Sequence, residues 1–162
     1  MPVFINDEQR EHSIDCMLLE SQGESILLFL GCETQELSVL LADDRKIRTL
    51  NKQYLGQDRA TDVLAFSQNE EKEEKEENKP NSHLMGDVVI STVTAKRQAA
   101  EHGLTLEEEI VLLLIHGILH LLGFDHERSN EEACHMKQKT RELFDWIFPN
   151  KKPEESCSLY SD

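Results

Sequence analysis

The order of apolar and polar positions predicts a chain in which short strands and longer helices mix without a strict alternation. Four apolar segments have the length of strands: residues 3–5, 37–42, 62–66 and 87–90. Five longer stretches carry helical spacing or helix-end signals, at about residues 14–30, 43–56, 92–102, 105–123 and 129–148. These elements predict an α+β fold, with a small mixed four-stranded sheet packed against about five helices.

Two of these elements are expected in the interior of the protein. The strand at residues 37–42 carries apolar side chains on both faces, which is typical of a strand in the middle of a sheet. The helix that opens with the capping-box pair Thr105 and Glu108 is apolar nearly all round from Ile110 and ends at Gly123. A helix with that pattern is predicted to be the buried central helix of the domain.

The length of 162 residues fits one domain, which we assign to residues 1–150. Residues 68–82 contain an acidic run and offer nothing to pack, so we expect a mobile acidic loop there. Residues 151–162 are polar and are expected to form a frayed tail. No apolar run reaches the length of a membrane span, and the N-terminus lacks the features of a signal peptide. We therefore expect no membrane partner.

The cysteines are scattered, with no close pair among them. This pattern favours free thiols in a reducing compartment over a disulfide framework. Together with the absence of a signal peptide, it predicts a cytoplasmic protein. The cysteines are Cys16, Cys32, Cys134 and Cys157.

The net charge of −15 is unfavourable for a nucleic-acid partner, because an anionic ligand would have to overcome the overall field. One segment, residues 45–59, is locally basic, and Asp58 is its only acidic residue. Its cations are Arg45, Lys46, Arg48, Lys52 and Arg59. The segment is either an anion-binding patch or the solvated face of a helix that carries Ile47, Leu50 and Tyr54 on one face.

A cluster of histidines lies at the C-terminal end of the predicted central helix. His116 and His120 are four residues apart, so their side chains lie on one face of the helix and can reach one ion. Gly123 can turn the chain back and bring His126 round as a third ligand. Three imidazoles with a fourth position left to water are typical of a catalytic zinc site. The sequence therefore predicts one Zn²⁺ ion, although nickel, copper and iron also suit imidazole ligands.

The spacing of this cluster is also found in metzincin proteases, where a Glu directly follows the first His and acts as the general base. Here that position is Gly117, so the metallopeptidase alternative lacks a group worth about 10²–10⁴-fold in rate. Asp125 is the nearest carboxylate along the chain. It either orients a ligand histidine or caps the turn, and the sequence leaves both roles open.

The segment 116–126 resembles the signature of the YbeY family of bacterial rRNA maturation factors. Two further stretches agree with that family and occur in the same order, at residues 58–67 and 86–91. The resemblance runs from about Leu50 to the end of the last helix. It implies a zinc-dependent, single-strand-specific endoribonuclease that acts in 16S rRNA 3′-end maturation and late ribosome quality control in the cytoplasm. It also implies that His116, His120 and His126 are the zinc ligands.

Two positions depart from the family pattern. Leu55 follows Tyr54 where the family has an Arg that is thought to serve activity, and Ala60 replaces a Pro. We expect Arg59, in the loop after this helix, to take over the contact with a phosphate group, because a guanidinium pairs bidentately with phosphate. The alternative is that Arg59 is an ordinary loop residue.

Three functions are carried forward from these patterns. The first is the endoribonuclease, with single-stranded 16S rRNA and the small ribosomal subunit or its associated proteins as partners. The second is a zinc-stabilised ribosome-assembly factor with little nuclease activity, a reading that Leu55 favours. The third is the metallopeptidase, which Gly117 disfavours.

Overall fold

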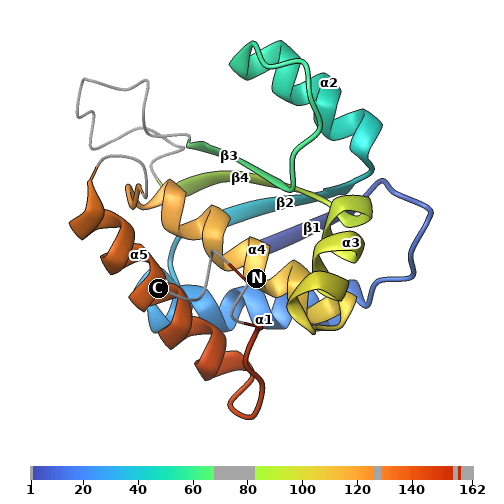
Figure 1. Cartoon of the computed structure of the whole chain (residues 1–162). Coiled ribbons are helices and arrows are strands. Elements are labelled where there is room, and N and C mark those ends of the chain that lie inside the picture. The colour runs from blue at the N-terminus through green and yellow to red at the C-terminus, as the bar shows by residue number, and fades with distance from the viewer. Residues whose placement is uncertain (1, 68–82, 126–128, 155–156, 158–162) are drawn as a thin grey trace.

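A computed structural model describes residues 2–67, 83–125, 129–154 and 157. It contains a four-stranded sheet and helices on both of its faces (Figure 1). The strands are β1 (Val3–Asp7), β2 (Glu36–Ala42), β3 (Val63–Ser67) and β4 (Leu84–Ser91). The helices are α1 (Cys16–Phe29), α2 (Asp44–Leu55), α3 (Thr92–His102), α4 (Leu106–Leu121) and α5 (Asn130–Ile147). The predicted α+β class is confirmed.

The strands are arranged in the order β1-β2-β4-β3. β2 runs parallel to both of its neighbours, whereas β3 pairs with β4 in the antiparallel sense, so the sheet is mixed as predicted. β2 therefore has a strand on each side, which confirms its predicted place inside the sheet. Val39 of β2 lies opposite Val88 of β4, which in turn lies opposite Ala65 of β3.

The two faces of the sheet are covered very differently (Figure 1). α1, α4 and α5 lie on one face and enclose the main core, in which α4 is central. Twelve of the sixteen residues of α4 are buried, as expected of the central helix. α2 alone covers the other face, over a small cluster of Ala42, Ile47, Leu64 and Val89. Side chains alternate along a strand, so Val88 faces α4 while Val89 faces α2.

Helix ends follow the local signals in the sequence. Asp43 caps α2 by accepting a hydrogen bond from the backbone N–H of Lys46, and Ser129 caps α5 in the same way. Thr105 and Glu108 form the complete capping box of α4. Of the three residues expected on one face of α2, Ile47 is fully buried and Leu50 is half-buried, whereas Tyr54 is 61% exposed and lines a groove beside Leu50.

The described part of the C-terminal tail is attached to the domain, which corrects the expectation of a frayed tail. Lys151 lies 3.7 Å from Glu108, and the backbone N–H of Glu154 donates to the carbonyl of His102. Cys157 is fully buried in the main core. The acidic loop predicted at residues 68–82 lies outside the described residues. In the part of the chain that the structure describes, no helix is long and apolar enough to cross a membrane.

Candidate metal centre and its surroundings

The C-terminal end of α4 brings two histidines together. The Nε2 atoms of His116 and His120 are 3.0 Å apart, and the two rings meet edge to face with their centroids 4.6 Å apart. His116 is 8% exposed and His120 is half-buried. Both imidazoles therefore direct the same ring nitrogen to one point at the surface end of a buried helix.

This arrangement fits a shared zinc ion. Zinc binds histidine nitrogens at about 2.0–2.1 Å in a tetrahedral arrangement, which sets two ligand nitrogens about 3.3 Å apart. The observed separation of 3.0 Å needs only a few tenths of an ångström of movement to reach that value. Without metal, the same contact is a hydrogen bond in which one ring nitrogen donates to the other.

The third predicted ligand, His126, lies outside the described residues. Among the residues that are described, no cluster of three or more histidine, cysteine or carboxylate side chains is placed to hold a metal. The structure thus brings His116 and His120 together, and the role of His126 stays a prediction.

The chain turns back directly after these histidines, as expected of Gly123. Gly123 has a φ of 95° and its N–H donates to the carbonyl of His120, while the N–H of Phe124 donates to that of Leu119. This pair of bonds is the Schellman motif that closes a helix. Phe124 then packs against the ring of His135 on α5, with centroids 5.0 Å apart. His135 therefore supports the turn through this contact.

Asp125 follows the turn and is half-buried. Its position directly before the undescribed residues is compatible with both of its predicted roles, orienting a ligand histidine or capping the turn. Its function stays open.

Gly117 is required by the close packing of α4 on the sheet. A Cβ atom placed there would lie 2.7 Å and 3.0 Å from the two methyl groups of Val88, which is fully buried. It would also lie 3.4 Å from a methyl group of Val63. A glutamate at this position would have to displace the sheet, so the backbone leaves no room for the general base of a metzincin.

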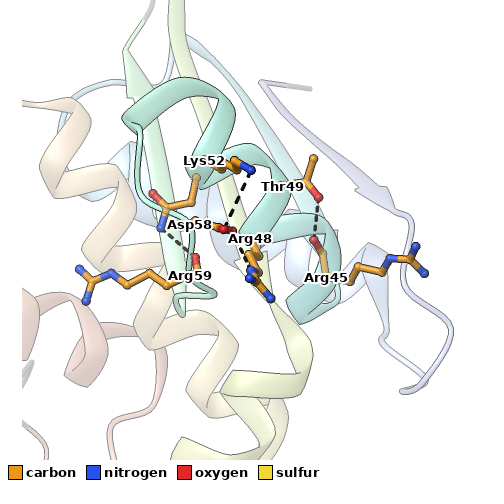
Figure 2. A network of polar contacts seen from close by, with 7 residues as sticks. Arg45, Arg48, Thr49, Lys52, Asp58 and Arg59 are labelled. Carbon is orange, nitrogen blue, oxygen red and sulfur yellow. Dashed lines mark hydrogen bonds and ion pairs between the residues drawn. The ribbon is translucent and has the colours of Figure 1, made fainter.

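The basic segment is partly neutralised within itself. Arg48 lies 2.8 Å from Asp58, and Lys52 lies 4.0 Å from the same carboxylate (Figure 2). The hydrogen bond from Arg48 lowers the pKa of Asp58 and raises the pKa of Arg48 itself. Two of the five cations therefore share one anion at the surface.

Arg59 extends away from this network, and Arg45 points in the opposite direction (Figure 2). The backbone carbonyl of Arg59 accepts a hydrogen bond from the buried side chain of Asn51, and its Nε atom donates to Gln57. Arg59 forms no ion pair with any residue that the structure describes. The loop is thus anchored while the guanidinium stays exposed, which is compatible with the predicted phosphate contact.

Two features were missed by sequence reasoning. His102 and Glu109 form a buried pair, with Nδ1 and Oε1 2.6 Å apart. Burial raises the pKa of Glu109, and the hydrogen bond and charge of His102 oppose this rise. The second feature is a groove of about 920 Å³ on the α2 face of the sheet, and Leu55 is one of its lining residues.

Fold and site together define an α+β protein that carries a converging pair of imidazoles on its central helix. The profile of the family described as Endoribonuclease YbeY matches residues 4–147. The chain is 44% identical to the Endoribonuclease YbeY of Persephonella marina over 145 residues, which are 90% of this chain and 92% of that protein. It is 46% identical to the Endoribonuclease YbeY of Aquifex aeolicus over 129 residues, 80% of this chain and 79% of the relative.

A solution structure from Thermotoga maritima has a similar fold. It superposes with a TM-score of 0.61 at 28% sequence identity and covers 91% of this chain and 89% of its own. The chain belongs to the YbeY family of endoribonucleases. The family resemblance expected from the three sequence motifs is thereby confirmed.

Proposed function

We propose that this protein is a zinc-dependent endoribonuclease that cleaves single-stranded RNA. Family membership supports the endoribonuclease class and an RNA substrate. The observation that carries the metal part is the 3.0 Å approach of the Nε2 atoms of His116 and His120 at the end of α4. We place its work in 16S rRNA 3′-end maturation and late quality control of the small ribosomal subunit, in the cytoplasm.

In this proposal, different residues bind the metal ion, support its ligands and hold the RNA. His116 and His120, with His126, would hold the ion, which supplies an activated water and stabilises negative charge on the phosphate. Gly117 lets α4 sit directly on the sheet, so the imidazoles start from a rigid support. Arg59 would pair with a phosphate oxygen and hold the RNA backbone.

The metal hypothesis is tested with the purified protein on a defined single-stranded RNA, with zinc content measured on the same samples. His116→Ala is expected to lose the bound zinc and to slow cleavage by at least about 10³-fold, the scale of metal-ion catalysis. His83→Ala is the control, because His83 is an exposed histidine beside Glu36. Equal cleavage by wild type and His116→Ala would rule out the metal-dependent mechanism.

The phosphate role of Arg59 has its own matched control. Arg59→Ala is expected to lower cleavage about 10- to 100-fold, the worth of a hydrogen bond to a charged group. Arg45→Ala removes another exposed cation, which points the other way, and it is expected to have little effect on cleavage (Figure 2). Equal cleavage rates for Arg59→Ala and Arg45→Ala would show that Arg59 is an ordinary loop residue.

A second function is favoured by one observation, the exposed Leu55 in the groove, where the family pattern has an Arg. It is a zinc-stabilised ribosome-assembly factor with little nuclease activity. This reading expects zinc in the protein, and loss of thermal stability in His116→Ala, but no cleavage by the wild type above the background of the variant. Cleavage that disappears together with zinc excludes it.

A further inference from the structure

The groove on the α2 face has no part in holding the predicted metal ion. Its floor is formed by side chains from β1, β2, β3 and β4, and its wall by α2 through Lys46, Leu50, Tyr54 and Leu55. Val89 lines the groove, whereas its neighbour Val88 packs under Gly117 of α4. The groove and the two histidines are thus supported by opposite faces of one strand. A volume of about 920 Å³ is at the upper end of the range for ligand pockets, so the groove can take an extended ligand.

Aromatic side chains stand in this groove with much of their surface in water. Phe4 is 51% exposed and Tyr54 is 61% exposed. The ring of Tyr54 rests against that of Phe66, with centroids 5.4 Å apart and the planes tilted by 59°. Phe66 belongs to the edge of the small cluster under α2, so it fixes Tyr54 from one side. Phe4 stands on the sheet and Tyr54 on the helix beside it. Exposed aromatic rings that line a groove can act as stacking platforms for unpaired bases.

The charges around the groove are separated in a way that suits a nucleic-acid strand. Lys46 lies in the α2 wall of the groove. Arg48 and Lys52 are exposed on the same helix, where both pair with Asp58 outside the residues that line the groove. Glu8 and Asp87, in contrast, line the groove itself. Phosphates are therefore repelled by Glu8 and Asp87 and attracted to Lys46, so a bound strand would turn its bases into the groove and its backbone towards the α2 wall.

We propose that this groove binds single-stranded RNA, with bases stacked on Tyr54 and Phe4 and the backbone along α2. The proposal takes its substrate class from the proposed function. A duplex would not fit it, because paired bases are already stacked on each other and cannot cover the aromatic rings. Leu55 then adds apolar surface to the groove at the position where the family pattern has an Arg.

The test compares Tyr54→Leu, Tyr54→Phe and Trp146→Leu in the full chain. Binding of a fluorescein-labelled twelve-nucleotide single-stranded RNA is measured by anisotropy with each change made in the His116→Ala protein, so that the RNA is not cut. Leu keeps an apolar side chain but has no ring to stack, so Tyr54→Leu is expected to weaken binding about 5- to 100-fold. Tyr54→Phe keeps the ring and is expected to bind as the parent does. Trp146, 52% exposed on α5, is the control for loss of an exposed ring.

Cleavage by the same variants with His116 restored separates this proposal from the proposed function. If the wild type cuts RNA and Tyr54→Leu binds like Trp146→Leu, the groove does not bind RNA while the endoribonuclease stands; its occupant is then another molecule, such as a protein segment. If the wild type does not cut but Tyr54→Leu alone weakens binding, the groove proposal stands without the nuclease. Equal loss of affinity in Tyr54→Phe would also overturn stacking as the mechanism.

Discussion

The two faces of the sheet have opposite physical characters. On the α4 face, the side chains of a large core are buried, and the histidine pair projects from the end of a helix that has almost no exposed surface. On the α2 face, a small cluster leaves a groove with exposed aromatic rings. One face therefore provides fixed positions, and the other provides accessible surface.

This difference suits the two tasks of a nuclease. Metal ligands must be held within a narrow range of positions, which requires tight packing beneath them. A groove for a flexible strand requires surface that is not already covered by the protein. β4 serves both faces, because alternate side chains of the same strand contact Gly117 and line the groove.

The largest predicted difference between the faces concerns core truncation. Leu113 is fully buried on α4, whereas Leu50 on α2 is half-buried beside the groove. Leu113→Ala is expected to lower the free energy of unfolding by about 3–5 kcal/mol, through lost burial and a cavity. Leu50→Ala is expected to cost about 1–2 kcal/mol, because it removes less buried surface and leaves no closed cavity. Urea unfolding of both variants measures the contrast, and equal losses would contradict it.

The next effect concerns the closeness of α4 to the sheet. Gly117→Ala gains helix propensity of about 1 kcal/mol but forces a Cβ against Val88, a clash worth about 1–3 kcal/mol or more. We expect a net loss of unfolding free energy together with weaker zinc binding. The control is Gly23→Ala in α1, where the closest methyl groups, those of Val3, lie at 3.1 and 3.3 Å. Stabilisation by both substitutions would show that α4 has room to move.

A third prediction concerns the buried carboxylate on the α4 face. Burial raises the pKa of Glu109, so the folded protein binds this proton more tightly than the unfolded chain does. The contribution of Glu109 to stability is therefore complete below the ordinary pKa of a glutamate. It is lost as the pH rises through the raised pKa of Glu109 in the folded protein. Glu109→Gln cannot ionise, so the stability of this variant relative to the wild type should increase from about pH 4 to pH 8. Glu107→Gln makes the same charge change at an exposed neighbour. A difference that is constant with pH would contradict the raised pKa.

Local signals in the sequence were sufficient to predict most helix ends. Asp43, Thr105 and Ser129 each cap the helix that follows them, because a cap depends on residues within one turn. The spacing of His116 and His120 likewise required only the geometry of a helix. Such predictions are reliable because these features depend on residues that are close together in the sequence.

Features built from distant segments were not predictable in the same way. Tyr54 was expected on the same helix face as Ile47 and Leu50, but helical spacing could not show that this face covers a groove, in which Tyr54 is 61% exposed. The pairing of His102 with Glu109 depends on the turn between α3 and α4, and the strand order depends on the whole chain. His126 stays a prediction, because the structure does not describe it.

The last and smallest predicted effect is that of Asp58 on RNA affinity. It tests whether the cations of α2 bind RNA or are only solvated by water. Asp58→Asn removes the anion shared by Arg48 and Lys52, so both cations become available to phosphate. Affinity for single-stranded RNA is expected to rise about 2- to 5-fold at low salt, and the gain should fade as salt screens it. Each newly engaged phosphate adds about 0.7 to the slope of log affinity against log salt. Glu11→Gln, an exposed carboxylate far along the chain, makes the same change in net charge without releasing these cations. If both variants bind RNA equally, Arg48 and Lys52 are ordinary solvated side chains of α2. The groove then binds RNA through its aromatic rings and not through these two cations.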